Sequence, residues 1–136
     1  MPFVLGSSVT LAWLLPDEAS EDAETLAARL ETDVATVPAV WPLEICNALL
    51  MAQRRGRIPG SDIERLAAAL ADLPIEVDRS VSELSIAALA SLARRLGLTA
   101  YDAAYIDLAK RRSLALATLD ARLRSACKKE GIAVLP

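Results

Sequence analysis

The chain has 136 residues, of which 54% are hydrophobic and 24% charged, with a formal net charge of -3 at pH 7. This length and composition predict one folded domain over residues 1–136 and argue against a disordered chain. The chain contains no histidine, which excludes Ser-His-Asp catalysis, Cys-His catalysis and histidine-ligated metals. Its five glycines form neither a G-x-G-x-x-G nor a P-loop motif. Acid and base chemistry must therefore fall to carboxylates, and any bound metal should be a hard cation such as Mg²⁺ or Mn²⁺.

Short apolar runs alternate along the chain with segments whose apolar residues recur every three or four positions. The runs predict buried strands, and the recurring positions predict amphipathic helices. In chain order, we expect a strand at 3–5, a turn at 6–8, a helix over 23–30 capped by Ser20, a strand at 34–37, a helix over 40–55, a helix over 63–70, a strand or extended link at 75–77, a helix over 84–96, a helix over 99–112, a strand at 114–118, a helix over 120–129 and a strand at 132–135.

The alternation of strand and helix predicts an α/β fold. We expect a three-layer α/β/α sandwich with a short parallel sheet of four or five strands. In such folds the ligand site lies beyond the carboxyl ends of the strands. The helix over 40–55 is expected to turn Leu43, Cys46 and Leu50 toward the core.

Charge is distributed unevenly along the chain. Arg29 is the only basic residue before residue 54, whereas nine basic residues fall between Arg94 and Lys129. This basic segment is interpreted either as a phosphate-binding surface or as solvated helix ends, where cations are favoured. The first third is acidic, with Asp17, Glu18, Glu21, Asp22, Glu24, Glu31, Asp33 and Glu44.

The sequence predicts a cytoplasmic protein without a membrane span. No Lys or Arg precedes Arg29, and Pro16 interrupts the apolar N-terminal run, which argues against a signal peptide. No apolar stretch reaches the roughly 18 residues that a span requires. Cys46 and Cys127 are far apart and form no C-x-x-C motif, which fits a reducing compartment.

Three carboxylates lie where this topology would place a site. Asp120 directly follows the strand at 114–118, and Asp102 lies three residues after Thr99. Each acid has a structural alternative, because Asp120 could cap the next helix and Thr99-x-x-Asp102 resembles a capping box. Glu44 is harder to explain structurally, since it occupies a mostly apolar helix and an unpaired carboxylate there would be costly.

Together these acids indicate metal-assisted phosphodiester chemistry. Carboxylates that converge from separate elements can hold Mg²⁺, which activates a water and neutralises phosphate charge without His or Cys. We therefore expect Glu44, Asp102 and Asp120 to converge in one acidic pocket. At least one of them should then have a raised pKa, because neighbouring like charges disfavour ionisation.

Four segments resemble, in order and spacing, the motifs of PIN-domain proteins. The closest likeness is to VapC-type toxins of bacterial toxin–antitoxin pairs. That resemblance implies a single PIN-like domain, an endoribonuclease dependent on Mg²⁺ or Mn²⁺, an RNA substrate and a cognate antitoxin protein. The four segments are Phe3-Val-Leu-Gly-Ser-Ser-Val9, Trp41-Pro-Leu-Glu-Ile-Cys-Asn-Ala-Leu49, Leu98-Thr-Ala-Tyr-Asp-Ala-Ala-Tyr105 and Leu116-Ala-Thr-Leu-Asp-Ala-Arg-Leu123.

The resemblance also implies roles for individual residues. The carboxylates of Glu44, Asp102 and Asp120 would be the catalytic and metal-binding groups. The supporting polar residues would be Ser8, Asn47 and Thr118, and Arg122 would contact an RNA phosphate. Asp107 lies about 140° around the helix from Asp102 and is interpreted as a surface residue.

One position departs from the family pattern. Gly6 occupies the place of an aspartate that normally ligates the metal, so the metal-ligand position there is vacant. The resemblance thus predicts weak metal binding and impaired cleavage. An alternative function is a non-catalytic PIN-like binding module, and an alternative role for Gly6 is a permissive turn after the strand.

The sequence further predicts a homodimer. The helical segments that carry Leu66, Leu70, Leu84 and Leu92 are rich in Ala and Leu for one small domain. A symmetric interface would cover such faces, although packing into the core explains them equally well.

Overall fold

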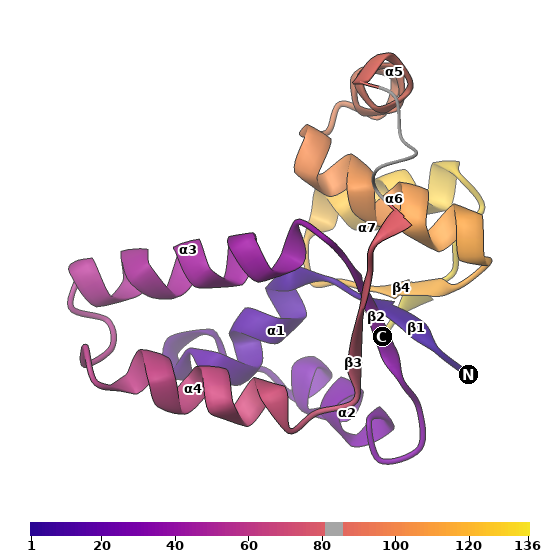
Figure 1. Cartoon of the computed structure of the whole chain (residues 1–136). Helices are drawn as coiled ribbons and strands as arrows, with labels where there is room; N and C mark the ends of the chain where they lie inside the picture. The colour runs from indigo at the N-terminus through magenta and orange to yellow at the C-terminus, as the bar shows by residue number, and fades with distance from the viewer. Residues whose placement is uncertain (81–85) are drawn as a thin grey trace.

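We analysed a computed structural model, which describes residues 1–80 and 86–136 (Figure 1). Five strands form one sheet in the order β3-β2-β1-β4-β5, and every neighbouring pair is parallel. The predicted α/β fold with a short parallel sheet is confirmed. The strands are β1 (Phe3–Leu5), β2 (Ala35–Pro38), β3 (Ile75–Asp78), β4 (Ala115–Ala117) and β5 (Val134–Leu135).

The predicted strands are present, with slightly shorter bounds at β4 and β5. Segment 75–77 is a strand rather than an extended link, because Ile75 to Asp78 pair in register with Ala35 to Pro38. The central strand β1 is completely buried from Phe3 to Leu5. The continuous apolar runs are thus explained by a sheet covered on both faces.

Helices cover both faces of the sheet. Strand order runs from β1 outward to β3 on one side and to β5 on the other, so right-handed crossovers place α1–α4 on one face and α5–α7 on the opposite face, as Figure 1 shows. The helices are α1 (Ser7–Leu14), α2 (Glu21–Arg29), α3 (Trp41–Arg54), α4 (Asp62–Ala71), α5 (Ile86–Leu96), α6 (Ala100–Arg112) and α7 (Ala121–Lys129), with a short 3-10 turn at Pro16–Glu18.

Two sequence-based expectations about helices were wrong. Segment 6–8 is not merely a turn, because α1 begins at Ser7. In α3 the buried side chains are Trp41, Ile45, Leu49 and Ala52, whereas Leu43 is 72% exposed. Both apolar sets on α3, the predicted and the observed, have helical spacing, so periodicity alone does not select the core face.

The predicted helix over 84–96 is α5, which the structure describes from Ile86. Leu84 lies outside the described residues. Among the residues that the structure does describe, no helix combines the length and apolar character that crossing a membrane requires. Cys46 is exposed, Cys127 is buried, and both are free thiols.

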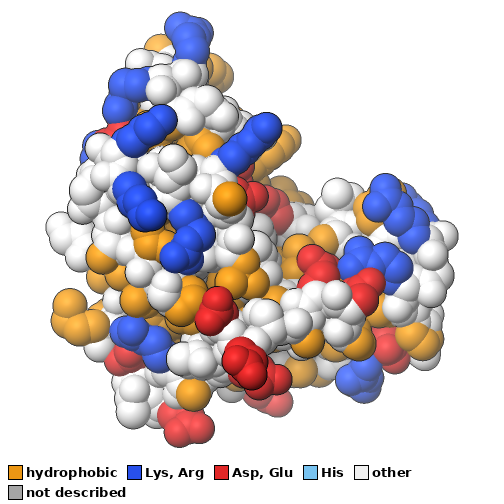
Figure 2. All heavy atoms as spheres, turned by 180° about the vertical axis from the view of Figure 1, so that it is seen from behind, with side chains coloured by type: hydrophobic (Ala, Val, Ile, Leu, Met, Phe, Trp, Pro, Cys, Tyr) orange, Lys and Arg blue, Asp and Glu red, His pale blue; other side chains and the backbone are white. Residues whose placement is uncertain are grey.

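Ion pairs engage part of the basic C-terminal segment. Glu130 accepts hydrogen bonds from Arg95 and, at 2.9 Å, from Lys110, and its side chain is only 7% exposed. Asp78 lies near Arg111 and Arg112, with nitrogen–oxygen distances of 3.5 and 3.8 Å. Figure 2 shows several Lys and Arg side chains spread over one lobe of the surface. These pairs tie α5, α6 and β3 together.

A buried hydrogen-bond chain joins α3 to the end of β1. The indole Nε1 of Trp41 donates to Thr10 Oγ1 over 3.1 Å, and Thr10 Oγ1 donates to the carbonyl oxygen of Gly6 over 3.3 Å. Thr10 is completely buried, and so is Thr36 in β2. The hydroxyl of Thr36, by contrast, has no hydrogen-bond partner among the described residues.

These two threonines allow a matched test. Thr10→Val should lower the free energy of unfolding by about 1–3 kcal/mol, because it leaves the buried Trp41 N–H without an acceptor. Thr36→Val, the same change at an equally buried site, should be neutral or stabilising because it removes an unpaired hydroxyl. Urea denaturation of both variants measures the difference, and equal losses would contradict it.

Candidate active site

The three predicted acids all begin helices near one edge of the sheet. Glu44 lies in the first turn of α3, Asp102 in the first turn of α6, and Asp120 is the N-cap of α7. Because α3 and α7 follow parallel strands β2 and β4, their first residues lie at the carboxyl edge, where α/β folds place their ligands.

Glu44 is half-buried and bound to a tyrosine. Its Oε1 accepts a hydrogen bond from the hydroxyl of Tyr105 over 2.7 Å. Burial raises the pKa of the Glu44 carboxyl, the Tyr105 hydrogen bond opposes that rise, and the charge of Asp102 adds to it. Burial and the Glu44 charge also raise the pKa of the Tyr105 hydroxyl, so this tyrosine stays a donor.

Asp102 interacts electrostatically with both other acids. Its backbone N–H donates to Thr99 Oγ1 over 3.1 Å, so Thr99 caps α6 as the sequence predicted. Burial and the charge of Asp120 raise the pKa of the Asp102 carboxyl, and a hydrogen bond with Thr99 partly offsets this. The carboxyls of Glu44 and Asp102 thus both have raised pKa values, and burial contributes more to each rise than the charge of the neighbouring carboxylate.

Asp120 is exposed and caps α7. Its Oδ1 accepts a hydrogen bond from Leu123 N over 2.9 Å, and its own N–H donates to Thr118 Oγ1 over 3.1 Å. Thr118 is completely buried, and its Oγ1 lies 3.2 Å from Ser8 Oγ, which also accepts from Leu119 N. Ser8 and Thr118 thus fix the start of α1 against the loop that carries Asp120.

Gly6 is held by a close approach, not by a special backbone conformation. Its φ of -72° and ψ of 151° are extended values that any residue adopts, so the interpretation as a permissive turn was wrong. Its N–H donates to the carbonyl oxygen of Ala117 over 2.8 Å. A Cβ at residue 6 would lie 2.6 Å from that oxygen and 3.4 Å from Thr118 Cβ. Any side chain here requires the ends of β1 and β4 to move apart.

The remaining predicted residues lie around these acids or away from them. Asn47 lines a hollow of about 490 Å³ together with Glu44. Arg122 is exposed in the first turn of α7, two residues after Asp120 in the sequence. Asp107 keeps 16% of its side chain exposed and accepts a hydrogen bond of 2.6 Å from Arg111 at the surface. Its charge is therefore used within the fold.

Two tyrosines of the site had no role assigned from sequence. Tyr105 lies three residues after Asp102, which puts both on one side of α6, and this spacing was the signal for its contact with Glu44. Tyr101 is 61% exposed and lines the same hollow as Glu44 and Asn47. Exposure of that ring depends on how the starts of α3 and α6 are placed around the hollow, which periodicity does not reveal.

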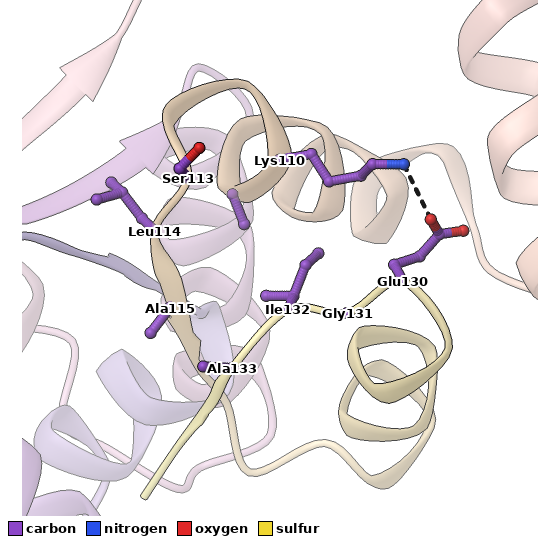
Figure 3. A pocket seen from close by; sticks show the side chains of 9 residues that line it. Lys110, Ser113, Leu114, Ala115, Glu130, Gly131, Ile132 and Ala133 are labelled. Atoms are coloured by element: carbon purple, nitrogen blue, oxygen red, sulfur yellow. Dashed lines mark hydrogen bonds and ion pairs between the residues drawn. The ribbon is translucent and has the colours of Figure 1, made fainter.

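A second hollow, of about 440 Å³, lies at the opposite edge of the sheet (Figure 3). It is lined by the segments that lead into β4 and β5, including Ser113, Leu114 and Ile132. Among the described residues that line it, the only carboxylate is that of Glu130, which points toward Lys110 and is paired with it. This hollow therefore offers no free acid for catalysis.

The donor set fits an open site for a divalent cation. Carboxylate oxygens are the ligands that suit Mg²⁺ and Mn²⁺. Within residues 1–80 and 86–136, no three Asp, Glu or Cys side chains lie close enough together to enclose an ion. Mg²⁺ commonly keeps several waters and uses one or two carboxylates plus phosphate oxygens. Asp102, which is coupled to both other acids, is the residue best placed to be one of those ligands.

The raised pKa values predict a pH-dependent stability. The pKa of the Glu44 carboxyl is higher in the folded state than in the unfolded state, so the folded state binds more protons between these two pKa values. The free energy of unfolding therefore falls as the pH rises from the unfolded-state pKa to the folded-state pKa. Glu44→Gln keeps an acceptor for Tyr105 and removes the charge. The thermal midpoint of this variant relative to wild type should be similar near pH 4 and higher near pH 7.

Differential scanning fluorimetry across this pH range measures the effect. Glu64→Gln, at an exposed position of α4, is the matched control and should show no such trend. A Glu44→Gln difference that does not change with pH would contradict the raised pKa of Glu44 in the folded state.

Comparisons with known proteins agree with this architecture. The structure is similar to that of PAE2754 from Pyrobaculum aerophilum, with 23% identity, a TM-score of 0.67, and coverage of 98% of this chain and 83% of that one. It is also similar to FitAcB from Neisseria gonorrhoeae, with 22% identity, a TM-score of 0.54, and coverage of 100% and 97%. At these identities the likeness shows the fold alone. No curated protein sequence matches significantly. The PIN domain family model, however, matches residues 3–129, and the chain therefore belongs to the PIN-domain family.

Proposed function

We propose that this protein is a metal-dependent endoribonuclease and the toxin of a toxin–antitoxin pair in the cytoplasm. The observation that carries the proposal is the position of Asp102, which is half-buried and coupled to both Glu44 and Asp120. Uncompensated carboxylates of this kind mark sites that gain from a cation. PIN domains are generally metal-dependent nucleases, which supports the same function.

The chain's own residues would divide the work as follows. Asp102 would ligate Mg²⁺ or Mn²⁺ directly, and Glu44 and Asp120 would share the ion or bind its waters; the ion, when bound, lowers the pKa of a water and neutralises phosphate charge. Tyr105 fixes the orientation of Glu44 through its 2.7 Å hydrogen bond. Ser8 and Thr118 hold the loop before α7. Asn47 would support the substrate next to Glu44, and Arg122 would contact an RNA phosphate.

A cleavage assay tests the nuclease proposal. Purified protein should cut single-stranded RNA with Mg²⁺ or Mn²⁺ and leave it intact when EDTA is present. The rate should be low, because Gly6 provides no carboxylate where the family pattern has one. Metal-independent cutting, or no cutting at any metal concentration, would count against the proposal.

A non-catalytic binding module is the second candidate. It is favoured by Gly6 and by the lack of three clustered acids in the part of the chain that the structure describes. Calorimetric titration with Mn²⁺ separates the two functions, since a nuclease site should give saturable heat and a rise in thermal midpoint. A binding module should give neither.

We also propose a homodimer and an antitoxin partner. Leu66 is buried and Leu70 and Leu92 pack partly against the core, which favours the core role for these side chains. An apolar hollow of about 360 Å³ between α3, α4 and β3 remains for an interface. Light scattering should report twice the chain mass of 14.5 kDa, and a monomer at micromolar concentration would exclude the dimer.

A further inference from the structure

We propose that Tyr101 stacks on a nucleobase of the substrate, in a subsite beside the acidic residues. We call this subsite the base pocket, and it is the hollow of about 490 Å³ lined by Ser7, Leu43, Glu44, Asn47, Ala48 and Tyr101. The inference rests on the proposed RNA-cleaving function. It adds the position at which an unpaired base of the RNA would bind.

Exposed apolar surface is concentrated at the base pocket. The described part of the chain exposes four large hydrophobic side chains, and two of them, Tyr101 at 61% and Leu43 at 72%, line this hollow. Exposed aromatic rings are the usual platforms for single-stranded bases, because every base offers a π-face.

Charge indicates which part of a nucleotide the base pocket accepts. None of the described residues lining it is Lys or Arg, and the carboxylate of Glu44 lies in its wall. A phosphate would be repelled there, whereas a neutral base would not. Asn47 adds an amide that can donate and accept hydrogen bonds at a base edge.

The position of Tyr101 next to Asp102 indicates which nucleotide of the RNA would stack on the ring. Tyr101 and Asp102 are consecutive in α6, and Glu44 belongs both to the pocket wall and to the acidic group. A base on Tyr101 would therefore belong to a nucleotide next to the phosphate that is cut. Stacking at this position would hold that phosphate near Asp102.

The test measures RNA binding separately from cleavage. In an Asp102→Asn background, which should not cut, fluorescence anisotropy with a labelled single-stranded RNA in Mg²⁺ gives the Kd. Adding Tyr101→Ala should raise Kd by about 5- to 100-fold, the loss expected for one stacked base. Tyr101→Phe keeps the ring and should stay within about twofold. Ile86→Ala, which removes another exposed apolar side chain, should have no effect.

The outcomes distinguish this inference from the proposed function. If wild type cuts RNA but Tyr101→Ala leaves Kd unchanged, the nuclease stands and the stacking role is wrong. If Tyr101→Ala instead changes the oligomeric mass without changing Kd, the surface is a protein interface and the stacking role is again wrong. If no variant binds RNA and wild type does not cut it, both fall together. Circular dichroism of each variant checks that loss of binding is not loss of fold.

Discussion

Asp102→Asn should reduce metal-dependent RNA cleavage by about 100-fold or more while the protein stays folded. The change removes a carboxylate that is coupled to both Glu44 and Asp120, and it keeps the size of the side chain. Because the Asp102 carboxyl is disfavoured in its charged form, the variant should also have a higher thermal midpoint than wild type without metal. Stabilisation by Mn²⁺ should be largely lost.

Asp107→Asn is the matched control, with the same substitution in the same helix. Asp107 is engaged by Arg111, so its loss should affect stability rather than cleavage. Initial cleavage rates and thermal midpoints with and without Mn²⁺ provide both readouts. Equal loss of cleavage in the two variants would show that the Asp102 carboxylate has no specific role in cleavage.

Gly6→Asp should increase metal affinity and cleavage, but at a cost in stability. The added carboxylate would supply the ligand that the family pattern has at this position. Its Cβ would lie 2.6 Å from the carbonyl oxygen of Ala117, a contact that forces the ends of β1 and β4 apart. We therefore expect a lower thermal midpoint without metal, together with a larger rise when Mn²⁺ is added.

Gly6→Asn separates the carboxylate from the steric effect. Asparagine imposes the same Cβ and nearly the same volume, so it should destabilise the fold to a similar degree without improving cleavage. Calorimetry with Mn²⁺ and paired cleavage assays compare the two variants with wild type. If wild type already cuts as fast as Gly6→Asp, residue 6 does not ligate the metal in this protein.

Much of the fold was predictable because buried strands and helix caps have recognisable residue patterns in the sequence. Strand β1 reads as a continuous apolar run because both of its faces are covered, and Thr99 and Asp120 mark helix starts through their capping oxygens. Helix α1 has no such pattern in its sequence. It lies between other elements with Val9, Thr10, Ala12 and Leu14 all buried, so it lacks a polar face that would reveal its period.

The site was predictable as a set of residue types, but not as a geometry. The sequence indicated Glu44, Asp102 and Asp120, and local pattern also accounts for two of them as helix-start residues. The pairing of Glu44 with Tyr105 joins residues 61 positions apart, and the close approach at Gly6 depends on sheet register. Such contacts are properties of the packed chain, which spacing along one element cannot encode.

The ion pairs of the C-terminal half limit how strongly salt can weaken RNA binding. Of the nine basic residues between Arg94 and Lys129, Arg95, Lys110, Arg111 and Arg112 pair with acids, and Arg124 donates to backbone oxygens. The other four, with no ion pair in the described part, are Arg94, Arg122, Lys128 and Lys129. Only cations free to neutralise phosphates release condensed counterions, so the slope of log K against log salt contributed by the segment 94–129 should be no steeper than about -3.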